Sequence, residues 1–141
     1  MTIFAELAAA THYSFLRGAS SPADMVMQAM MLGMTGIGIA DRNSVAGVVR
    51  AHAALRRAHE DAAEEGLVLP EFRLIVGSRL VFADDTPETI VYPRNRRGWG
   101  RLTRLLSTGN LRAEKGACFL YETDLLQWCD EDWALIILPE A

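Results

Sequence analysis

The sequence predicts an α/β fold with a mostly parallel sheet, and three observations support this expectation. Short apolar runs at residues 3–10, 36–40 and 73–82 are candidate strands. Stretches with helical periodicity and start signals separate these runs. Polar turns follow the first two runs at residues 11–17 and 41–43. Alternation of strands and helices is typical of parallel α/β folds, in which sites lie at the carboxyl ends of the strands.

The first half of the chain predicts two strand–helix units. Ser21 is a suitable cap for a helix in which Pro22 takes the first position and Gly33 follows the end. After the strand at residues 36–40, a second helix is expected over residues 44–65. We expect its core face to contain Val45, Val48 or Val49, His52 and Leu55.

The second half predicts one hairpin and a further helical segment. Gly77 interrupts the strand at residues 73–82 and indicates a bulge or a close backbone approach. Residues 84–87 turn the chain into an antiparallel strand at 88–92. Asn95 is a suitable cap for a helix over 96–107, which Gly109 and Asn110 should end. A short helix at 124–129 and a last buried strand at 133–138 complete the expected elements.

Bulk composition places the chain among globular domains. It has 141 residues, a net charge of −4 and an apolar fraction of 50%, so we expect a single domain with its own core. No apolar run is long enough to span a bilayer, and residues 1–10 lack the basic start of a signal peptide. The two cysteines, Cys118 and Cys129, do not form a CxxC motif. We therefore expect a cytoplasmic protein with reduced thiols.

The polar residues at the expected strand ends are the first candidate site: His12, Ser14, Arg17, Asp41, Arg42 and Arg79. A hydrolytic metal site needs several His, Asp or Glu ligands, and here one His and one Asp stand among three arginines. The arginines could form an anion site, since guanidinium groups suit phosphate. Alternatively, the arginines pair with Glu6 and Asp41, and their side chains fill the space at the strand ends.

A basic segment is the second candidate site. Seven of the fourteen basic residues fall between positions 94 and 115. This bias predicts weak, salt-sensitive contact with DNA. The alternative is an ordinary solvated helix face. The expected contacts are Arg94, Arg96, Arg97, Arg101 and Arg104.

Several segments resemble one known family. These are residues 13–20 (YSFLRGAS), 36–41 (GIGIAD), 46–52 (AGVVRAH), 76–80 (VGSRL), 92–93 (YP), 100–107 (GRLTRLLS) and 112–116 (RAEKG). Together they resemble the N-terminal PHP domain of bacterial C-family DNA polymerases, and above all the error-prone, alpha-subunit-like branch. The likeness covers nearly the whole chain. It implies the first part of a PHP-type distorted β/α barrel, with mostly parallel strands and one hairpin, so that residues 1–141 are a single, partial PHP domain.

The resemblance also implies where metal ligands would stand. The family's ligand positions in this segment fall on Ala8, Ala10, Arg17, Arg42 and Arg79, and none of these residues is a metal ligand. We therefore expect no catalytic residue, no bound metal and no cofactor. His12, Arg17, Asp41, Arg42 and Arg79 are expected to form a vestigial or anion site.

The function that follows is a non-catalytic scaffold segment of an error-prone, alpha-subunit-like DNA polymerase that acts in replication and damage-tolerant synthesis. Two alternatives stay open: a divergent metal-dependent phosphoesterase of the PHP superfamily, and a free-standing module that binds nucleic acid or protein. The expected partners are the remainder of the polymerase chain and, weakly, DNA, with no membrane. A homodimer is also expected, since the strand at residues 133–138 would leave an apolar edge unpaired.

Overall fold

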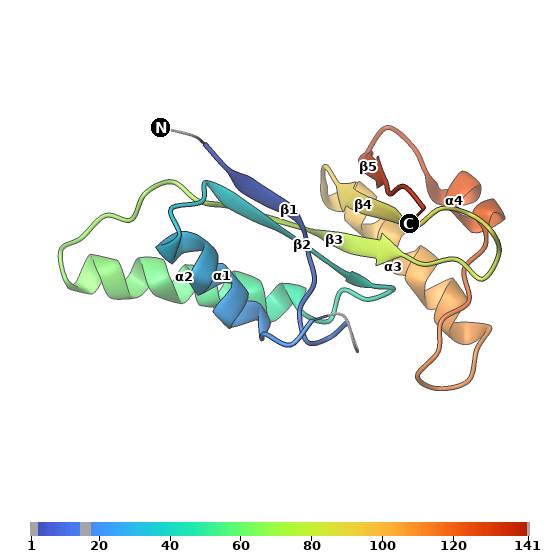
Figure 1. Cartoon of the computed structure of the whole chain (residues 1–141), viewed down its shortest axis with the longest axis horizontal. Coiled ribbons are helices and arrows are strands. Elements are labelled where there is room, and N and C mark those ends of the chain that lie inside the picture. Colours follow the sequence, from blue (N-terminus) through green and yellow to red (C-terminus); the bar gives the residue numbers. More distant parts are fainter. Residues whose placement is uncertain (1–2, 15–17, 141) are drawn as a thin grey trace.

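One sheet organises the chain in the computed structural model, which describes residues 3–14 and 18–140. The sheet order is β1-β2-β3-β4-β5 (Figure 1). The described elements are β1 (Ala5–Ala9), α1 (Pro22–Met31), β2 (Gly36–Arg42), α2 (Val48–Glu64), β3 (Arg73–Leu80), β4 (Thr89–Pro93), α3 (Arg96–Leu111), α4 (Glu122–Trp128) and β5 (Trp133–Ile137).

The strand directions confirm the predicted fold class. β1 pairs with β2, and β2 with β3, in parallel. β4 pairs antiparallel with both β3 and β5. Among the described strands, β4 therefore runs against the other four, and the β3–β4 hairpin is the one expected from the turn at residues 84–87. Sequence reasoning had not specified the direction of β5.

The core lies mainly between one face of the sheet and its helices. α1 and α2 cross β1–β3 on that face, where Val26 and Ala51 pack with Ile37 and Ile39 (Figure 1). Further along the same face, leucines of α3 pack against β3, β4 and β5. The opposite face is called the inner face below. It holds a smaller cluster formed by Ala40, Ile90 and Tyr92, with Ile75, Ala134, Ile136 and Leu138 packed against it.

Local signals set two helix starts as predicted. The Ser21 hydroxyl accepts a hydrogen bond from Asp24 N at 3.1 Å, and the Asn95 side chain accepts one from Gly98 N at 2.9 Å. The start predicted for α2 was wrong by four residues, because its N-cap is Gly47. Residues 43–46 instead form a turn in which Asn43 has a φ of +46°.

Three other boundary or burial predictions were wrong. His52 is exposed and does not belong to the α2 core face. α3 continues through Gly109 to Leu111, since this glycine is a packing position: a Cβ there would lie 2.6 Å from Leu120 Cδ2. β5 is an edge strand on which Leu135 and Ile137 are exposed, whereas a fully buried strand was expected.

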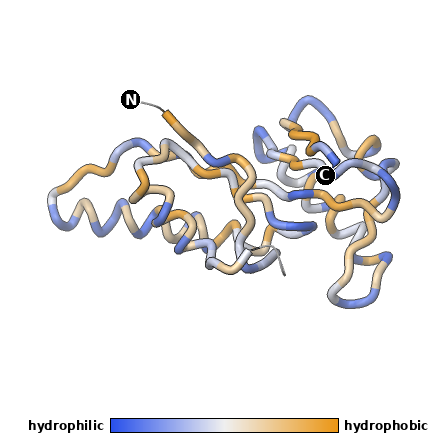
Figure 2. Tube along the Cα trace, in the orientation of Figure 1, coloured by the Kyte–Doolittle hydropathy of each residue, from blue (hydrophilic) through white to orange (hydrophobic). Residues whose placement is uncertain are grey.

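Both edges of the sheet expose apolar side chains. At the β5 edge Ile137 is 68% exposed, and at the β1 edge Ile3 and Phe4 are 79% and 50% exposed. Figure 2 shows hydrophobic colours at the N-terminal segment and at β5. The unpaired apolar edge expected from the sequence is therefore present. None of the described helices is long and apolar enough to cross a membrane.

Candidate functional site

A pocket of about 230 Å³ opens on the inner face of the sheet at the carboxyl ends of β1, β2 and β3. We call it the strand-end pocket. It brings together four of the five positions to which the resemblance assigned metal ligands, and the fifth, Arg17, lies outside the described residues. Alternation along each strand explains the grouping, since side chains two residues apart share a face. The lining residues are Ala8, Ala10, Ser14, Ala40, Arg42, Arg79 and Val81.

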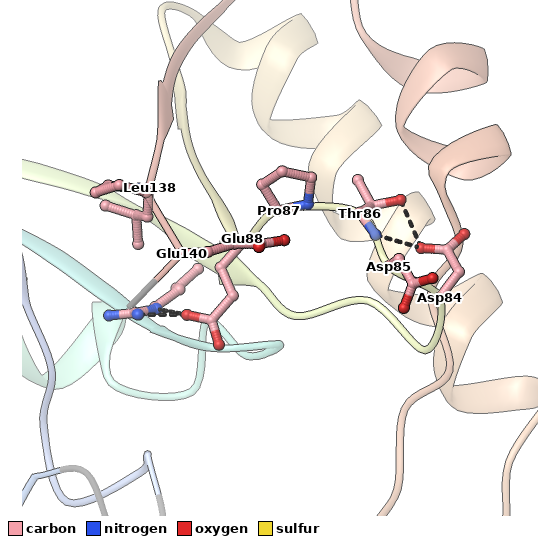
Figure 3. Close-up of a pocket in the computed structure, with 9 residues that line it drawn as sticks. Asp84, Asp85, Thr86, Pro87, Glu88, Leu138 and Glu140 are labelled. Atoms are coloured by element: carbon pink, nitrogen blue, oxygen red, sulfur yellow. Dashed lines mark hydrogen bonds and ion pairs between the residues drawn. The ribbon is translucent and has the colours of Figure 1, made fainter.

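Arg79 is held by a carboxylate from the neighbouring hairpin. Its Nε donates to Glu88 Oε2 at 2.6 Å, and its Nη2 contacts the same oxygen. In Figure 3 a dashed line joins the Glu88 carboxylate to this guanidinium group, which is drawn without a label. Both side chains are about a quarter exposed. Sequence reasoning had considered Glu6 and Asp41 as the partners of the arginines, and it missed Glu88. The hairpin register could have indicated it, because Arg79 lies opposite Ile90, close to Glu88.

Asp41 does not line the strand-end pocket. Its side chain is buried and faces the turn that follows β1. One carboxylate oxygen accepts from Thr11 N and Ser14 Oγ, and the other accepts from Thr11 Oγ1, each at 2.7 Å. The carboxylate therefore anchors the loop, as expected for a buried charge that is satisfied by several donors.

Two serines extend this anchor across the neighbouring loops. Ser14 Oγ accepts from Arg42 N at 2.8 Å while it donates to Asp41. Ser78 Oγ donates to the Asp41 carbonyl at 2.9 Å and accepts from Ser44 N at 3.1 Å. The hydroxyl of Ser14 is thus engaged in holding the fold, and no histidine lines the pocket beside it. Sequence reasoning had not predicted this network.

His12 is exposed, with its ring 4.6 Å from that of Tyr13. It is absent from the lining of the strand-end pocket. Of the five residues expected to form a vestigial or anion site, the structure places Arg42 and Arg79 in the pocket. His12 and Asp41 lie elsewhere, and Arg17 is not described.

Tyr92 lies across the inner face of the sheet, next to this site. Its ring extends from β4 over Gly77 of β3 and Gly38 of β2. A Cβ added at Gly77 would lie 2.7 Å from Tyr92 Cδ1, and a Cβ added at Gly38 would lie 2.4 Å from the Tyr92 hydroxyl oxygen. The hydroxyl donates to Leu7 O of β1 at 2.5 Å. Burial, with a smaller effect of Glu6, raises the pKa of Tyr92 above its usual value of 10.0. The close approach predicted at Gly77 is confirmed.

The residues that line the pocket do not fit a divalent metal ion. Hydrolytic metal centres use several His, Asp or Glu side chains. Across residues 3–14 and 18–140, no group of three or more His, Cys, Asp or Glu side chains is placed to hold a metal ion. The pocket offers methyl groups from Ala8 and Ala10 and guanidinium groups from Arg42 and Arg79. A guanidinium group has no lone pair available for a metal and repels cations.

The basic segment is partly neutralised. Five arginines lie in α3 or, in the case of Arg94, just before it, and we call them the α3 arginines: Arg94, Arg96, Arg97, Arg101 and Arg104. Arg97 pairs with Asp130 and Asp132 at 3.0 and 2.6 Å, and Arg101 lies 3.2 Å from Asp130. The fold thus brings the acidic segment at residues 130–132 to the start of α3. The other three α3 arginines are exposed and form no ion pair with the described carboxylates.

Comparison with known families agrees with the fold. The sequence model for the PHP domain matches residues 6–138. This chain belongs to the PHP domain family. Its PHP domain is also similar in fold to a candidate metal-dependent phosphoesterase from Bifidobacterium adolescentis. The TM-score is 0.53 at 22% identity, over 76% of this chain and 33% of that one.

Curated relatives of this PHP domain are named error-prone DNA polymerases. Those from Sinorhizobium medicae and Rhizobium meliloti are 50% and 52% identical over 139 residues, which is 99% of this chain. The relative from Caulobacter vibrioides is 45% identical over the same share of the chain. The chain spans about 11% of the length of the first two relatives and 12% of the third.

Proposed function

We propose that this chain is a non-catalytic scaffold segment of an error-prone, alpha-subunit-like DNA polymerase. The observation that carries the proposal is the lining of the strand-end pocket. Alanines and arginines stand there at the positions for which the family resemblance implies metal ligands. The similarity to error-prone DNA polymerases over 99% of the chain supports the assignment to replication and damage-tolerant synthesis. Polymerisation itself would belong to other parts of a longer, cytoplasmic protein.

The proposed structural role rests on buried polar contacts in place of metal bonds. Asp41 joins the turn after β1 to β2 through three hydrogen bonds of 2.7 Å. Arg79 and Glu88 join β3 to the residues that precede β4. A bound metal cluster would hold the same loops through its ligands. We infer that this network keeps the loop geometry of the domain without a metal.

Metal analysis tests the proposal. The chain, purified without chelator, is expected to contain Zn and Mn well below one ion per molecule, and to leave p-nitrophenyl phosphate intact when either metal is added. One or more ions per chain, together with metal-dependent hydrolysis, would favour the phosphoesterase alternative. Arg42→Ala serves as a check in that case, since a reaction in the strand-end pocket should respond to a change in its lining.

We also propose that residues 1–141 form one partial PHP domain whose open edges meet further polymerase chain. The apolar exposure at both edges of the sheet supports this arrangement. In isolation the β5 edge is expected to pair with a second copy. Sequencing the reading frame downstream of this segment gives the direct test. A frame that encodes polymerase carboxylates is expected, and one that encodes an unrelated domain would support the free-standing module.

A further inference from the structure

The charge order along α2 is opposite to the one that stabilises a helix by itself. Arg50, Arg56 and Arg57 all precede the acidic residues, which lie in the C-terminal half of the helix. The first turn has no acidic residue and the last turn no basic one, although the helix dipole favours the reverse distribution. The acidic residues are Glu60, Asp61 and Glu64. Helix stability alone therefore does not explain this distribution of charge.

The outward side of α2 also carries a regular seam. Its members are spaced alternately four and three residues apart, which is the spacing of a coiled-coil contact line. All are exposed, with Val49 at 76% and Leu67, just after the helix, at 58%. The seam consists of Val49, Ala53, Arg56, Glu60, Ala63 and Leu67. Such spacing on a solvent-exposed face indicates a surface that meets another helix.

The seam is self-complementary when it is reversed about Ala58. In an antiparallel pair, Arg56 of one copy faces Glu60 of the other, and the alanines at positions 53 and 63 face each other. Small side chains at those positions let the two helices approach closely. Val49 of one copy then lies towards the end of the mate's helix, which Leu67 follows after a turn at Gly66.

We propose that two copies of this chain associate through the α2 seam, antiparallel about a two-fold axis that passes between Arg56 and Glu60 at the level of residue 58. Charge complementarity identifies the second copy as the occupant, since Arg56 of each helix then faces Glu60 of its mate. An interface of this kind is isologous and closes after two subunits. It differs from pairing at the β5 edge, which lies on another part of the sheet.

The charges of Arg56 and Glu60 at the centre of the interface should make the association sensitive to salt. Within one helix, Arg56 Nε donates to Glu60 Oε1 at 3.0 Å, and both side chains are more than half exposed. An exposed pair of this kind contributes little by itself and is screened by salt. In the dimer, two arginines and two glutamates would form one cluster. A two-helix contact is smaller than a standard interface, so the association should be weak and should fall with ionic strength.

Charge-swap variants test the proposal by sedimentation equilibrium. All proteins carry Ile137→Lys, which blocks the exposed β5 edge. At low salt and concentrations on the order of tens to hundreds of micromolar, the parent should approach twice the monomer mass. Arg56→Glu alone and Glu60→Arg alone should each weaken dimerisation at least about tenfold, because like charges then meet across the two-fold axis.

The deciding sample is a one-to-one mixture of these two single variants. In the mixed dimer, the glutamate introduced by Arg56→Glu meets the arginine introduced by Glu60→Arg, so association should return, although each separate helix keeps its own like-charged pair. The Arg56→Glu/Glu60→Arg double variant should also dimerise, and Arg104→Glu, an exposed change on α3, should dimerise like the parent. Circular dichroism checks that every variant keeps its helix content. A monomeric parent, a dimer insensitive to either single change, or a mixture that stays monomeric would overturn the proposal.

Discussion

The hydroxyl oxygen of Tyr92 lies 2.5 Å from the carbonyl oxygen of Leu7, 85 residues earlier in the chain. β4 and β1 are not neighbours in the sheet, so this hydrogen bond crosses both intervening strands. It anchors the edge strand β1 from the inner face.

Removing this hydroxyl should weaken the fold. Tyr92→Phe leaves the Leu7 carbonyl without its donor, and we expect the free energy of unfolding to fall by about 1–2 kcal/mol. Urea denaturation measures the change. Tyr13→Phe is the matched control, because no hydrogen bond joins the Tyr13 hydroxyl to the described residues. An equal loss in both variants would contradict the proposed role of Tyr92.

The same tyrosine should make the protein sensitive to alkali. Burial is the main reason that the pKa of Tyr92 is raised above its usual 10.0. The folded state therefore keeps a proton that the unfolded state loses, so stability is retained below about pH 10 and declines as the pH rises further. Tyr92→Phe should show a smaller decline in unfolding free energy between about pH 9 and 11. Identical slopes for the variant and the wild type would rule out this contribution.

Gly38 should be intolerant of even one methyl group. A Cβ there would lie 2.4 Å from the Tyr92 hydroxyl oxygen, and we expect Gly38→Ala to cost about 1–3 kcal/mol of unfolding free energy. Adding Tyr92→Phe should relieve part of that cost, which a double-mutant cycle would detect. Gly100→Ala is the control, because nothing lies within 4 Å of its added Cβ in α3. It should stabilise the chain by about 0.5–1 kcal/mol.

Asp124 should contribute to stability only above acidic pH. Hydrogen bonds from Arg112 hold the pKa of this buried carboxyl below its usual 3.8, and the Tyr121 amide adds to the effect. A lowered pKa in the folded state means that the contribution is present above about pH 4 and is lost as the pH falls through the folded-state value. The difference in unfolding free energy between wild type and Asp124→Asn should therefore shrink on acidification. A constant difference from about pH 6 to 2 would contradict this expectation.

The α3 arginines should differ in their effect on DNA binding. Arg94, Arg96 and Arg104 are free of the acidic segment that engages Arg97 and Arg101. Fluorescence anisotropy with a short single strand at low salt should show weak binding that falls steeply with added salt. Replacing the three free arginines with alanine should reduce the salt slope more than Arg97→Ala does. Binding that is absent, or independent of salt, would identify the segment as a solvated helix face.

Local signals predicted the elements of this fold well. Ser21 and Asn95 cap the helices that follow them, and the polar turn at residues 84–87 produces the β3–β4 hairpin. These features depend on neighbours within a few residues, so the sequence reveals them directly. The end of α3 was predicted too early because Gly109 resembles a helix stop, while its role is contact with Leu120, which belongs to a later segment.

The site was only partly predictable for the same reason. Strand alternation places Ala8, Ala10, Arg42 and Arg79 on one face. The resemblance implied that these positions correspond to metal-ligand positions of the family. Which partner each charge takes depends on distances between loops. Glu88 binds Arg79, and Asp41 turns towards Thr11 and Ser14, and neither choice follows from spacing along the chain.

The glycines beneath Tyr92 have a consequence for the evolution of the family. Gly38 would collide with the Tyr92 side chain if it gained a Cβ, so these two positions should change together, whereas Gly77 would also meet the Val91 carbonyl of β4 whatever residue stands at position 92. A relative with a larger residue at position 38 is therefore expected to have lost the tyrosine, and a lineage that keeps the tyrosine is constrained to glycine at that position.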